Sequence, residues 1–171
     1  MRKGYVQVYT GDGKGKTTAA LGLALRAAGA GLKVFVCQFV KNQKCSEHRM
    51  LGRLGQAVTC RQYGRGLIRR GASEADIAAA RKGLHDAAEA LSVGGYDLVI
   101  LDEVNVAVYC GLIDVEDVLG LIAKKPAGIE LVLTGRNAHP RIMEAADLVT
   151  EMRSVKHYYD KGVKARRGIE K

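Results

Sequence analysis

The sequence has no tryptophan, only two prolines, and aromatic residues make up just 5% of its 171 residues. Proteins that recognise single-stranded nucleic acid commonly stack bases on aromatic side chains, so this scarcity counts against that class. With so few prolines, and without internal repeats or low-complexity stretches, nothing marks a linker, and the length suits one ordinary domain. We therefore expect residues 1–171 to form a single domain.

Cysteine pairs with metal-ligand spacing are also missing. The four cysteines, Cys37, Cys45, Cys60 and Cys110, form no C-x-x-C pair and suggest neither a zinc site nor a disulfide framework. No apolar run approaches the roughly 20 residues of a membrane span, and residues 1–4 lead into a strand-like segment without the apolar region of a signal peptide. We therefore expect a cytoplasmic protein with no membrane partner.

Negative charge is in short supply. The chain carries 27 Lys and Arg residues against 18 Asp and Glu residues, which gives a formal net charge of +9. Such a balance favours an anionic partner, but it does not choose among a nucleotide, a nucleic acid and a membrane surface.

Short β-type apolar runs alternate with helical patterns along the chain, which is typical of a parallel sheet with helices on both faces. The fold class predicted from this alternation is α/β, with a mostly parallel sheet flanked by helices. The predicted strands are Tyr5–Tyr9, Lys33–Phe39, Val58–Tyr63, Asp97–Leu101, Ile129–Leu133 and Asp147–Met152.

A helix is predicted between the third and fourth of these strands. Ser73 suits its N-cap, and Asp76 three residues later is typical of a capping box. Apolar residues then recur at helical spacing, at Ile77, Leu84, Ala88 and Leu91. We interpret this helix as part of the scaffold.

The glycine-rich stretch TGDGKGKTT, residues 10–18, lies between a predicted strand and a helix-forming segment. This is the setting of a P-loop, in which backbone N–H groups and a helix N-terminus converge on phosphate oxygens. Lys16 then supplies a point charge to the phosphates, and Thr17 offers a hydroxyl to Mg²⁺. The pattern G-x-x-x-x-G-K-[ST] asks for glycine where this chain has Thr10. The flanking strand and helix nevertheless favour phosphate binding over a simple glycine turn.

A second signal is the segment YDLVILDE, in which four apolar residues are followed by Asp102 and Glu103. This is a Walker B arrangement, and in a P-loop fold it places carboxylates beside the loop, opposite Thr17. Two acids at the end of a strand are usually solvated, but together with a P-loop they predict an Mg²⁺ site. A third candidate is Arg136 in VLTGRNAHP, which is either a phosphate ligand or a solvated loop residue on its spacing alone.

Four stretches together resemble the ATP:corrinoid adenosyltransferases of the CobA/BtuR type. They are YTGDGKGKTTAALGLALRAAGAGLKVFVCQFVK, YDLVILDEVNVA, LVLTGRNAHP and DLVTEMRSVKHYYDKGVKARRGIE. The resemblance implies a RecA-like P-loop NTPase fold, usually in a homodimer. It also implies an enzyme that transfers the 5′-deoxyadenosyl group of ATP to the Co(I) of a reduced corrinoid and releases triphosphate, in adenosylcobalamin biosynthesis or salvage.

The resemblance also assigns roles to residues. It implies Mg²⁺ as cofactor at Thr17 and Glu103, Lys16 as the group that stabilises the leaving triphosphate, and no protein nucleophile. Leu67 and Ile68 lie in a segment that resembles the part closing over the corrinoid, where the family commonly has an aromatic residue. An electron donor such as a reduced flavoprotein is the further partner implied. The implied ATP-binding residues are Gly11, Asp12, Gly13, Lys14, Gly15, Lys16, Thr17, Thr18 and Arg136.

Two other functions stay open at this point. One is a RecA-like ATPase acting on nucleic acid, which the basic stretches 61–70 and 156–171 favour. The other is a small P-loop kinase, for which Arg65, Arg69 and Arg70 could form an arginine lid. Both would break the bond between the β- and γ-phosphates, whereas an adenosyltransferase breaks the bond between C5′ and oxygen.

Overall fold

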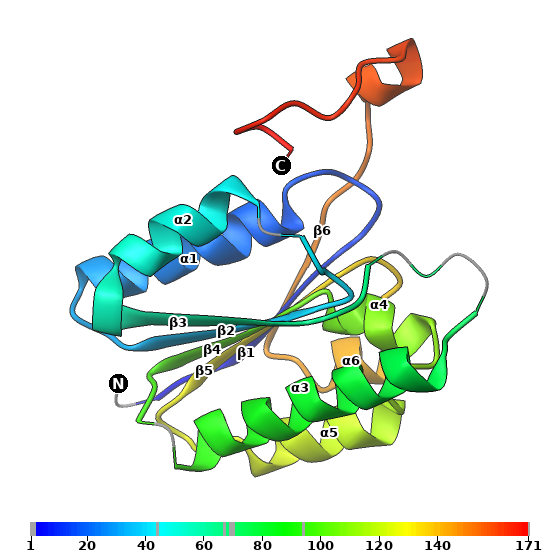
Figure 1. The fold of residues 1–171 in the computed structure, drawn as a ribbon. Coiled ribbons are helices and arrows are strands. Elements are labelled where there is room, and N and C mark those ends of the chain that lie inside the picture. The colour runs from blue at the N-terminus through cyan, green and yellow to red at the C-terminus, as the bar shows by residue number, and fades with distance from the viewer. Residues whose placement is uncertain (1–2, 44, 67, 69–70, 94, 171) are drawn as a thin grey trace.

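The computed structural model describes residues 3–43, 45–66, 68, 71–93 and 95–170. Its centre is a six-stranded sheet in the order β3-β2-β4-β5-β1-β6, in which every neighbouring pair is parallel (Figure 1). All six predicted strands are confirmed, with bounds that agree to within one residue. They are β1 (Val6–Thr10), β2 (Val34–Phe39), β3 (Val58–Tyr63), β4 (Leu98–Asp102), β5 (Glu130–Thr134) and β6 (Leu148–Glu151).

Helices cover both faces of the sheet, as the alternating pattern predicts. On one face lie α1 (Lys16–Gly29) and α2 (Ser46–Arg53), and on the other lie α3 (Glu74–Ser92), α4 (Val104–Tyr109), α5 (Val115–Lys124) and α6 (Pro140–Glu144) (Figure 1). Two short 3₁₀ helices, η1 (Gly55–Ala57) and η2 (Tyr158–Lys161), complete the described elements. Each face has its own apolar core, which is what an all-parallel sheet requires because both of its faces are buried.

The helix α3 begins as the sequence predicts. The Asp76 N–H donates to Ser73 Oγ at 3.2 Å, and the Ser73 N–H donates to the Asp76 carboxylate at 3.1 Å, which completes a capping box. Its apolar residues do not all face the sheet, however, because Ala88 is exposed. Small residues line the contact, and a Cβ added to Gly83 would lie 2.8 Å from the Tyr63 ring. The helix therefore packs too closely on the sheet for larger side chains at that position.

The carboxyl ends of the strands gather at one edge of the sheet, and four connections with polar side chains leave from it. The glycine-rich loop follows β1, Lys41 follows β2, Glu103 follows β4, and Arg136 follows β5. Open parallel sheets bind ligands at this edge. Within the described residues, no helix has the length and apolar character needed to cross a membrane.

Candidate nucleotide and metal site

The loop between β1 and α1 has the backbone of a phosphate-binding turn. Gly11 and Gly15 have φ angles of 91° and 122°, which side chains disfavour, and a Cβ on Gly11 would lie 2.4 Å from the Met152 carbonyl oxygen. The residue that departs from the usual pattern, Thr10, is the buried last residue of β1. Its hydroxyl accepts a hydrogen bond from the Ala138 N–H at 3.2 Å. Thr10 therefore anchors the loop after β5. The first glycine that the backbone of the P-loop requires is Gly11.

Lys16 is held inside this loop. Its side chain is buried, and its Nζ donates to the carbonyl oxygens of Gly11 and Gly13 at 2.6 and 2.7 Å. Burial lowers the pKa of Lys16, and the positive charge of Arg136 lowers it further. Phosphate oxygens carry a full negative charge and form stronger bonds with an ammonium than carbonyl oxygens do. The position of Lys16 therefore suits exchange of these carbonyls for a phosphate group.

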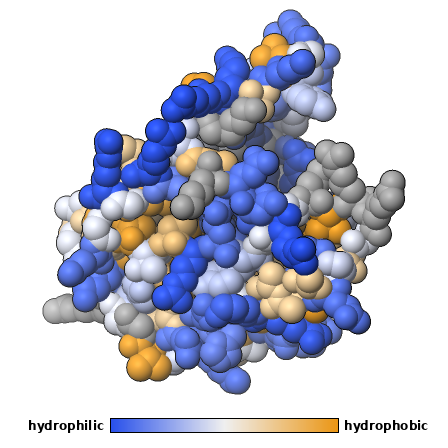
Figure 2. All heavy atoms as spheres, in the orientation of Figure 1, coloured by the Kyte–Doolittle hydropathy of each residue, from blue (hydrophilic) through white to orange (hydrophobic). Residues whose placement is uncertain are grey.

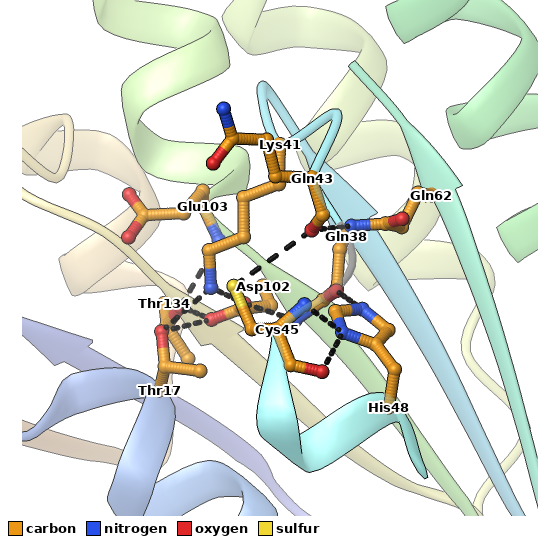
Figure 3. Close-up of polar contacts among 10 residues, drawn as sticks. All are labelled: Thr17, Gln38, Lys41, Gln43, Cys45, His48, Gln62, Asp102, Glu103 and Thr134. Carbon is orange, nitrogen blue, oxygen red and sulfur yellow. Dashed lines mark hydrogen bonds and ion pairs between the residues drawn. The ribbon is translucent and has the colours of Figure 1, made fainter. Parts of the chain in front are cut away.

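Asp102 is the centre of a buried polar cluster at the end of β4 (Figure 3). One carboxylate oxygen accepts hydrogen bonds from the hydroxyls of Thr17 at 2.8 Å and Thr134 at 2.7 Å. The other accepts from Gln38 Nε2 at 3.0 Å and Lys41 Nζ at 2.7 Å. Four donors, from α1, β2, β5 and the loop after β2, therefore fix this carboxylate beside the P-loop threonine.

Glu103 follows directly and differs from Asp102 in its surroundings. Its backbone has a φ of 64°, and its N–H donates to the Thr134 hydroxyl at 3.0 Å. The carboxylate is half-buried and lies apart from the hydrogen-bonded cluster in Figure 3. Burial raises its pKa, and the nearby Asp102 carboxylate raises it further. A carboxylate with raised pKa in this position is suited to a cation.

The donors at this edge fit Mg²⁺. Thr17 supplies a hydroxyl, and Asp102 and Glu103 supply carboxylates, which are the hard oxygen ligands that Mg²⁺ prefers. A positive charge already lies against two of them, because Lys41 Nζ is 2.7 Å from Asp102 Oδ2 and 3.3 Å from Thr17 Oγ1. The Asp102 carboxylate attracts the Lys41 ammonium strongly. Burial alone would lower the pKa of Lys41, but the attraction of Asp102 outweighs burial, so the pKa is raised.

The other predicted ATP-binding residues surround the loop. Arg136 reaches it from the end of β5, where its guanidinium donates to the Asp12 carbonyl oxygen at 3.3 Å and lies 3.8 Å from the Asp12 carboxylate. Thr18 is exposed in the first turn of α1. The structure therefore brings residues 11–18 and Arg136 together at one place.

The chain after β6 returns to the same loop. Lys14 Nζ donates to the Tyr158 hydroxyl at 2.7 Å and to Glu170 Oε1 at 2.6 Å. Glu170 also bonds to Arg166, and these partners hold the pKa of the Glu170 carboxyl well below its usual range. The other basic side chains of this segment are exposed, and Figure 2 shows a mainly hydrophilic surface there. Glu170 and Tyr158 thus fasten the segment to the P-loop.

The predicted corrinoid segment is only partly described. Leu67 lies outside the described residues, as do Arg69 and Arg70 of the alternative arginine lid. Ile68 is half-buried and packs against the core cluster on the α3 side of the sheet.

Sequence reasoning missed three members of the Asp102 cluster, namely Gln38, Lys41 and Thr134. Gln38 and Thr134 stand at the carboxyl ends of β2 and β5, and Lys41 lies in the loop just after β2. Gln38 gave a usable signal, because a fully buried amide in an otherwise apolar strand needs a partner. The lysine after β2 gave none, since a lysine that follows a strand is usually solvated.

Comparison with known proteins shows similarity to one family over nearly the whole chain. The profile of the family described as ATP:corrinoid adenosyltransferase BtuR/CobO/CobP matches residues 2–170. A corrinoid adenosyltransferase of Pseudomonas aeruginosa is 39% identical over 170 residues, which cover 98% of this chain and 84% of the relative. One of Escherichia coli is 38% identical over 169 residues, which cover 98% of this chain and 86% of the relative.

Among solved structures, the fold is similar to that of a KaiC-like protein from Pyrococcus horikoshii, with a TM-score of 0.59. The two chains are 16% identical, and the match covers 87% of this chain and 73% of the other. This likeness supports the RecA-like P-loop fold.

Proposed function

The chain belongs to the ATP:corrinoid adenosyltransferase family, and we propose that it transfers the 5′-deoxyadenosyl group of ATP to the cobalt of a reduced corrinoid in adenosylcobalamin biosynthesis or salvage. The observation that carries this proposal is the family match over residues 2–170, which includes the P-loop and the returning segment that Lys14 joins to it. An ATPase acting on nucleic acid and a small kinase share the P-loop alone, so the match does not favour them.

The reaction needs no nucleophile from the protein. The Co(I) of the corrinoid attacks C5′ of ATP, so a cobalt–carbon bond forms while the bond between C5′ and oxygen breaks. The electron pair of that bond leaves with the triphosphate, and the cobalt is oxidised from Co(I) to Co(III). Negative charge gathers on the departing oxygen, and Lys16 and the loop N–H groups stabilise it.

We assign the metal to Thr17 and Glu103, with Asp102 orienting the Thr17 hydroxyl through their 2.8 Å hydrogen bond. Bound Mg²⁺ supplies positive charge that stabilises the leaving triphosphate. The position of both residues beside Lys16, and the raised pKa of Glu103, support this assignment.

We assign the corrinoid to the segment that contains Leu67 and Ile68. Its support is the resemblance in sequence and the place of Ile68, which comes shortly after the carboxyl end of β3 and packs against the core cluster. Hydrogen exchange measured with and without a corrinoid tests it. We expect residues 64–72 to gain protection on binding, and unchanged protection would remove the assignment.

We further propose that the protein is a homodimer in the cytoplasm. An electron donor such as a reduced flavoprotein would reduce the corrinoid cobalt to Co(I). The strand β6 supports the dimer, because it is an edge strand with Leu148 and Val149 each 44% exposed. All four cysteines are free thiols, which agrees with a reducing compartment. Sedimentation of the protein and of Val149→Lys tests the interface, since the variant should be monomeric if β6 contributes.

Phosphorus NMR of the reaction products tests the function itself. The protein is incubated with Mg-ATP, with and without chemically reduced cobalamin. We expect inorganic triphosphate in amounts equal to the alkylated corrinoid, and almost no turnover without corrinoid, because water is too weak a nucleophile for C5′. Accumulation of ADP and orthophosphate without corrinoid, or only with DNA, would instead favour the ATPase.

A further inference from the structure

The Lys41 ammonium lies beside the Thr17 hydroxyl of the proposed metal site. Its Nζ lies 2.7 Å from Asp102 Oδ2 and donates to Thr17 Oγ1 at 3.3 Å, and its side chain is 27% exposed. Asp102 itself is 1% exposed at the side chain, so its negative charge depends on this partner. The ammonium thus contacts two of the oxygen-bearing side chains that suit Mg²⁺ (Figure 3).

An unfavourable backbone turn aims Lys41 at this position. Val40 has a φ of 64°, which is a genuine outlier for a β-branched residue. The Lys41 N–H donates to the Phe39 carbonyl oxygen at 2.7 Å, which closes a γ-turn around Val40. Gamma-turns with positive φ are rare and strained. Such strain persists only when the surroundings impose it, and it is concentrated at functional sites.

The surroundings of Val40 do impose the turn. A Cβ added to Gly64 would lie 2.1 Å from the Val40 carbonyl carbon, so only glycine allows this close contact. The Gly66 N–H donates to the Val40 carbonyl oxygen at 3.0 Å, and Asn42 Nδ2 donates to the Arg65 carbonyl oxygen at 2.6 Å. Residues 64–66 therefore hold the turn from the side of β3.

We propose that the Lys41 ammonium, held between Thr17 and Asp102 in the metal-free protein, takes the place of the metal at the Thr17 hydroxyl and leaves it when Mg²⁺ enters with ATP. Lys41 is thus a positioning residue that keeps the buried Asp102 charge paired and keeps the Thr17 hydroxyl in place between turnovers. It also makes the protein select the metal–nucleotide complex, because Mg²⁺ alone must displace a tethered charge. The inference rests on the metal assignment of the proposed function.

Substitution of Lys41 by methionine tests the proposal without ATP or corrinoid. Lys41→Met keeps a long, unbranched side chain but removes its charge. The control, Lys124→Met, removes an exposed lysine of α5. Without metal, Lys41→Met should melt about 5 °C or more below the parent protein, because Asp102 loses its partner. Addition of Mg²⁺ should restore much of this loss in Lys41→Met and change the parent and the control little.

A titration with Mn²⁺, followed by electron paramagnetic resonance, gives the direct measurement. We expect Lys41→Met to bind Mn²⁺ at least tenfold more tightly than the parent protein or Lys124→Met. Equal affinity in all three proteins would overturn the proposal, and so would a Lys41→Met melt that Mg²⁺ does not raise.

Nitrogen NMR of the parent protein covers the case in which Lys41→Met does not fold. The Lys41 ammonium signal should be protected from exchange in the metal-free protein and should shift on addition of Mg²⁺ with a non-reactive ATP analogue. An unchanged signal would overturn the proposal. None of these three measurements depends on adenosyl transfer. If they contradict the role of Lys41, the phosphorus NMR test of the proposed function still stands. If phosphorus NMR contradicts the proposed function, these measurements still test the role of Lys41.

Discussion

At the scale of single residues, Lys16 and Thr17 carry the charge and the hydroxyl on which phosphate binding depends. Lys16→Ala removes the ammonium that now bonds to the Gly11 and Gly13 carbonyls, and Thr17→Ala removes a donor to Asp102. We expect each to raise the Kd for Mg-ATP about 10- to 100-fold, the effect of losing a charged hydrogen bond or a metal ligand. Calorimetric titration measures this, and near-normal binding and turnover in both variants would remove the P-loop interpretation.

Glu103 and Asp102 are adjacent carboxylates with different expected behaviour. Glu103→Ala should abolish most activity while the melting temperature stays the same or rises, because burial and Asp102 disfavour its ionised form. Asp102→Ala should instead unfold easily, because it leaves four hydrogen-bond donors without their acceptor. These donors belong to Thr17, Thr134, Gln38 and Lys41. Thermal melts and turnover distinguish the two. Full activity in Glu103→Ala would assign the metal to Asp102 or to water.

At the scale of elements, the P-loop packs against the chain that follows β6. A Cβ added to Gly13 would lie 2.7 Å from the Arg153 carbonyl oxygen, so Gly13→Ala must push the loop away from residues 152–153. We expect it to weaken ATP binding at least about tenfold, because misdirected N–H groups no longer meet the phosphates.

The matched control for this change is Gly22→Ala, in the exposed middle of α1, where an added Cβ meets nothing within 4 Å. It should leave ATP binding unchanged and stabilise the protein by roughly 0.5 to 1 kcal/mol, since alanine favours the helix. Equal ATP affinities for the two variants would contradict the tight packing described for Gly13.

The strands β4 and β5 could be predicted from the sequence because a sheet buried on both faces needs continuous apolar runs, here LVIL and LVL, and both runs end at polar residues. The other four strands mix polar residues with β-branched and aromatic ones, and could be predicted from that composition and their short length. The P-loop and the Asp102–Glu103 pair could be predicted because their characteristic residues stand directly at the ends of two predicted strands, β1 and β4. The contacts of Lys41 and of Glu170 could not, because they depend on which strands become neighbours and on where the chain turns after β6. The packing of α3 through Gly83 depends likewise on the Tyr63 ring beneath it.

At the scale of the whole molecule, the buried thiol of Cys37 and the half-buried thiol of Cys60 make the protein less stable at alkaline pH. Burial raises the pKa of Cys60 to about 11, with Asp102 adding to the shift, and burial raises the pKa of Cys37 well above its usual value. From about pH 8.5 the unfolded chain releases thiol protons that the folded protein keeps. The folded state then binds more protons, so the free energy of unfolding falls as pH rises, by up to about 1.4 kcal/mol per pH unit for each thiol.

Urea unfolding between pH 7.5 and pH 10 in the presence of a reductant measures this slope. Cys60→Ala should make the slope shallower, because it removes one of the thiols. A free energy of unfolding that stays constant over this range would contradict the raised pKa of these two thiols.

The place of β1 within the sheet has a consequence for how the protein is made. The strand that carries the P-loop leaves the ribosome early, yet its neighbours are β5 and β6, with Val6 beside Leu131 and Gln7 beside Leu148. Lys14 meets its partner Glu170 156 residues later in the chain. Contacts so distant in sequence form late, after most of the chain has been translated. A growing chain therefore cannot complete the surroundings of its P-loop until β5, β6 and the segment after them have been made.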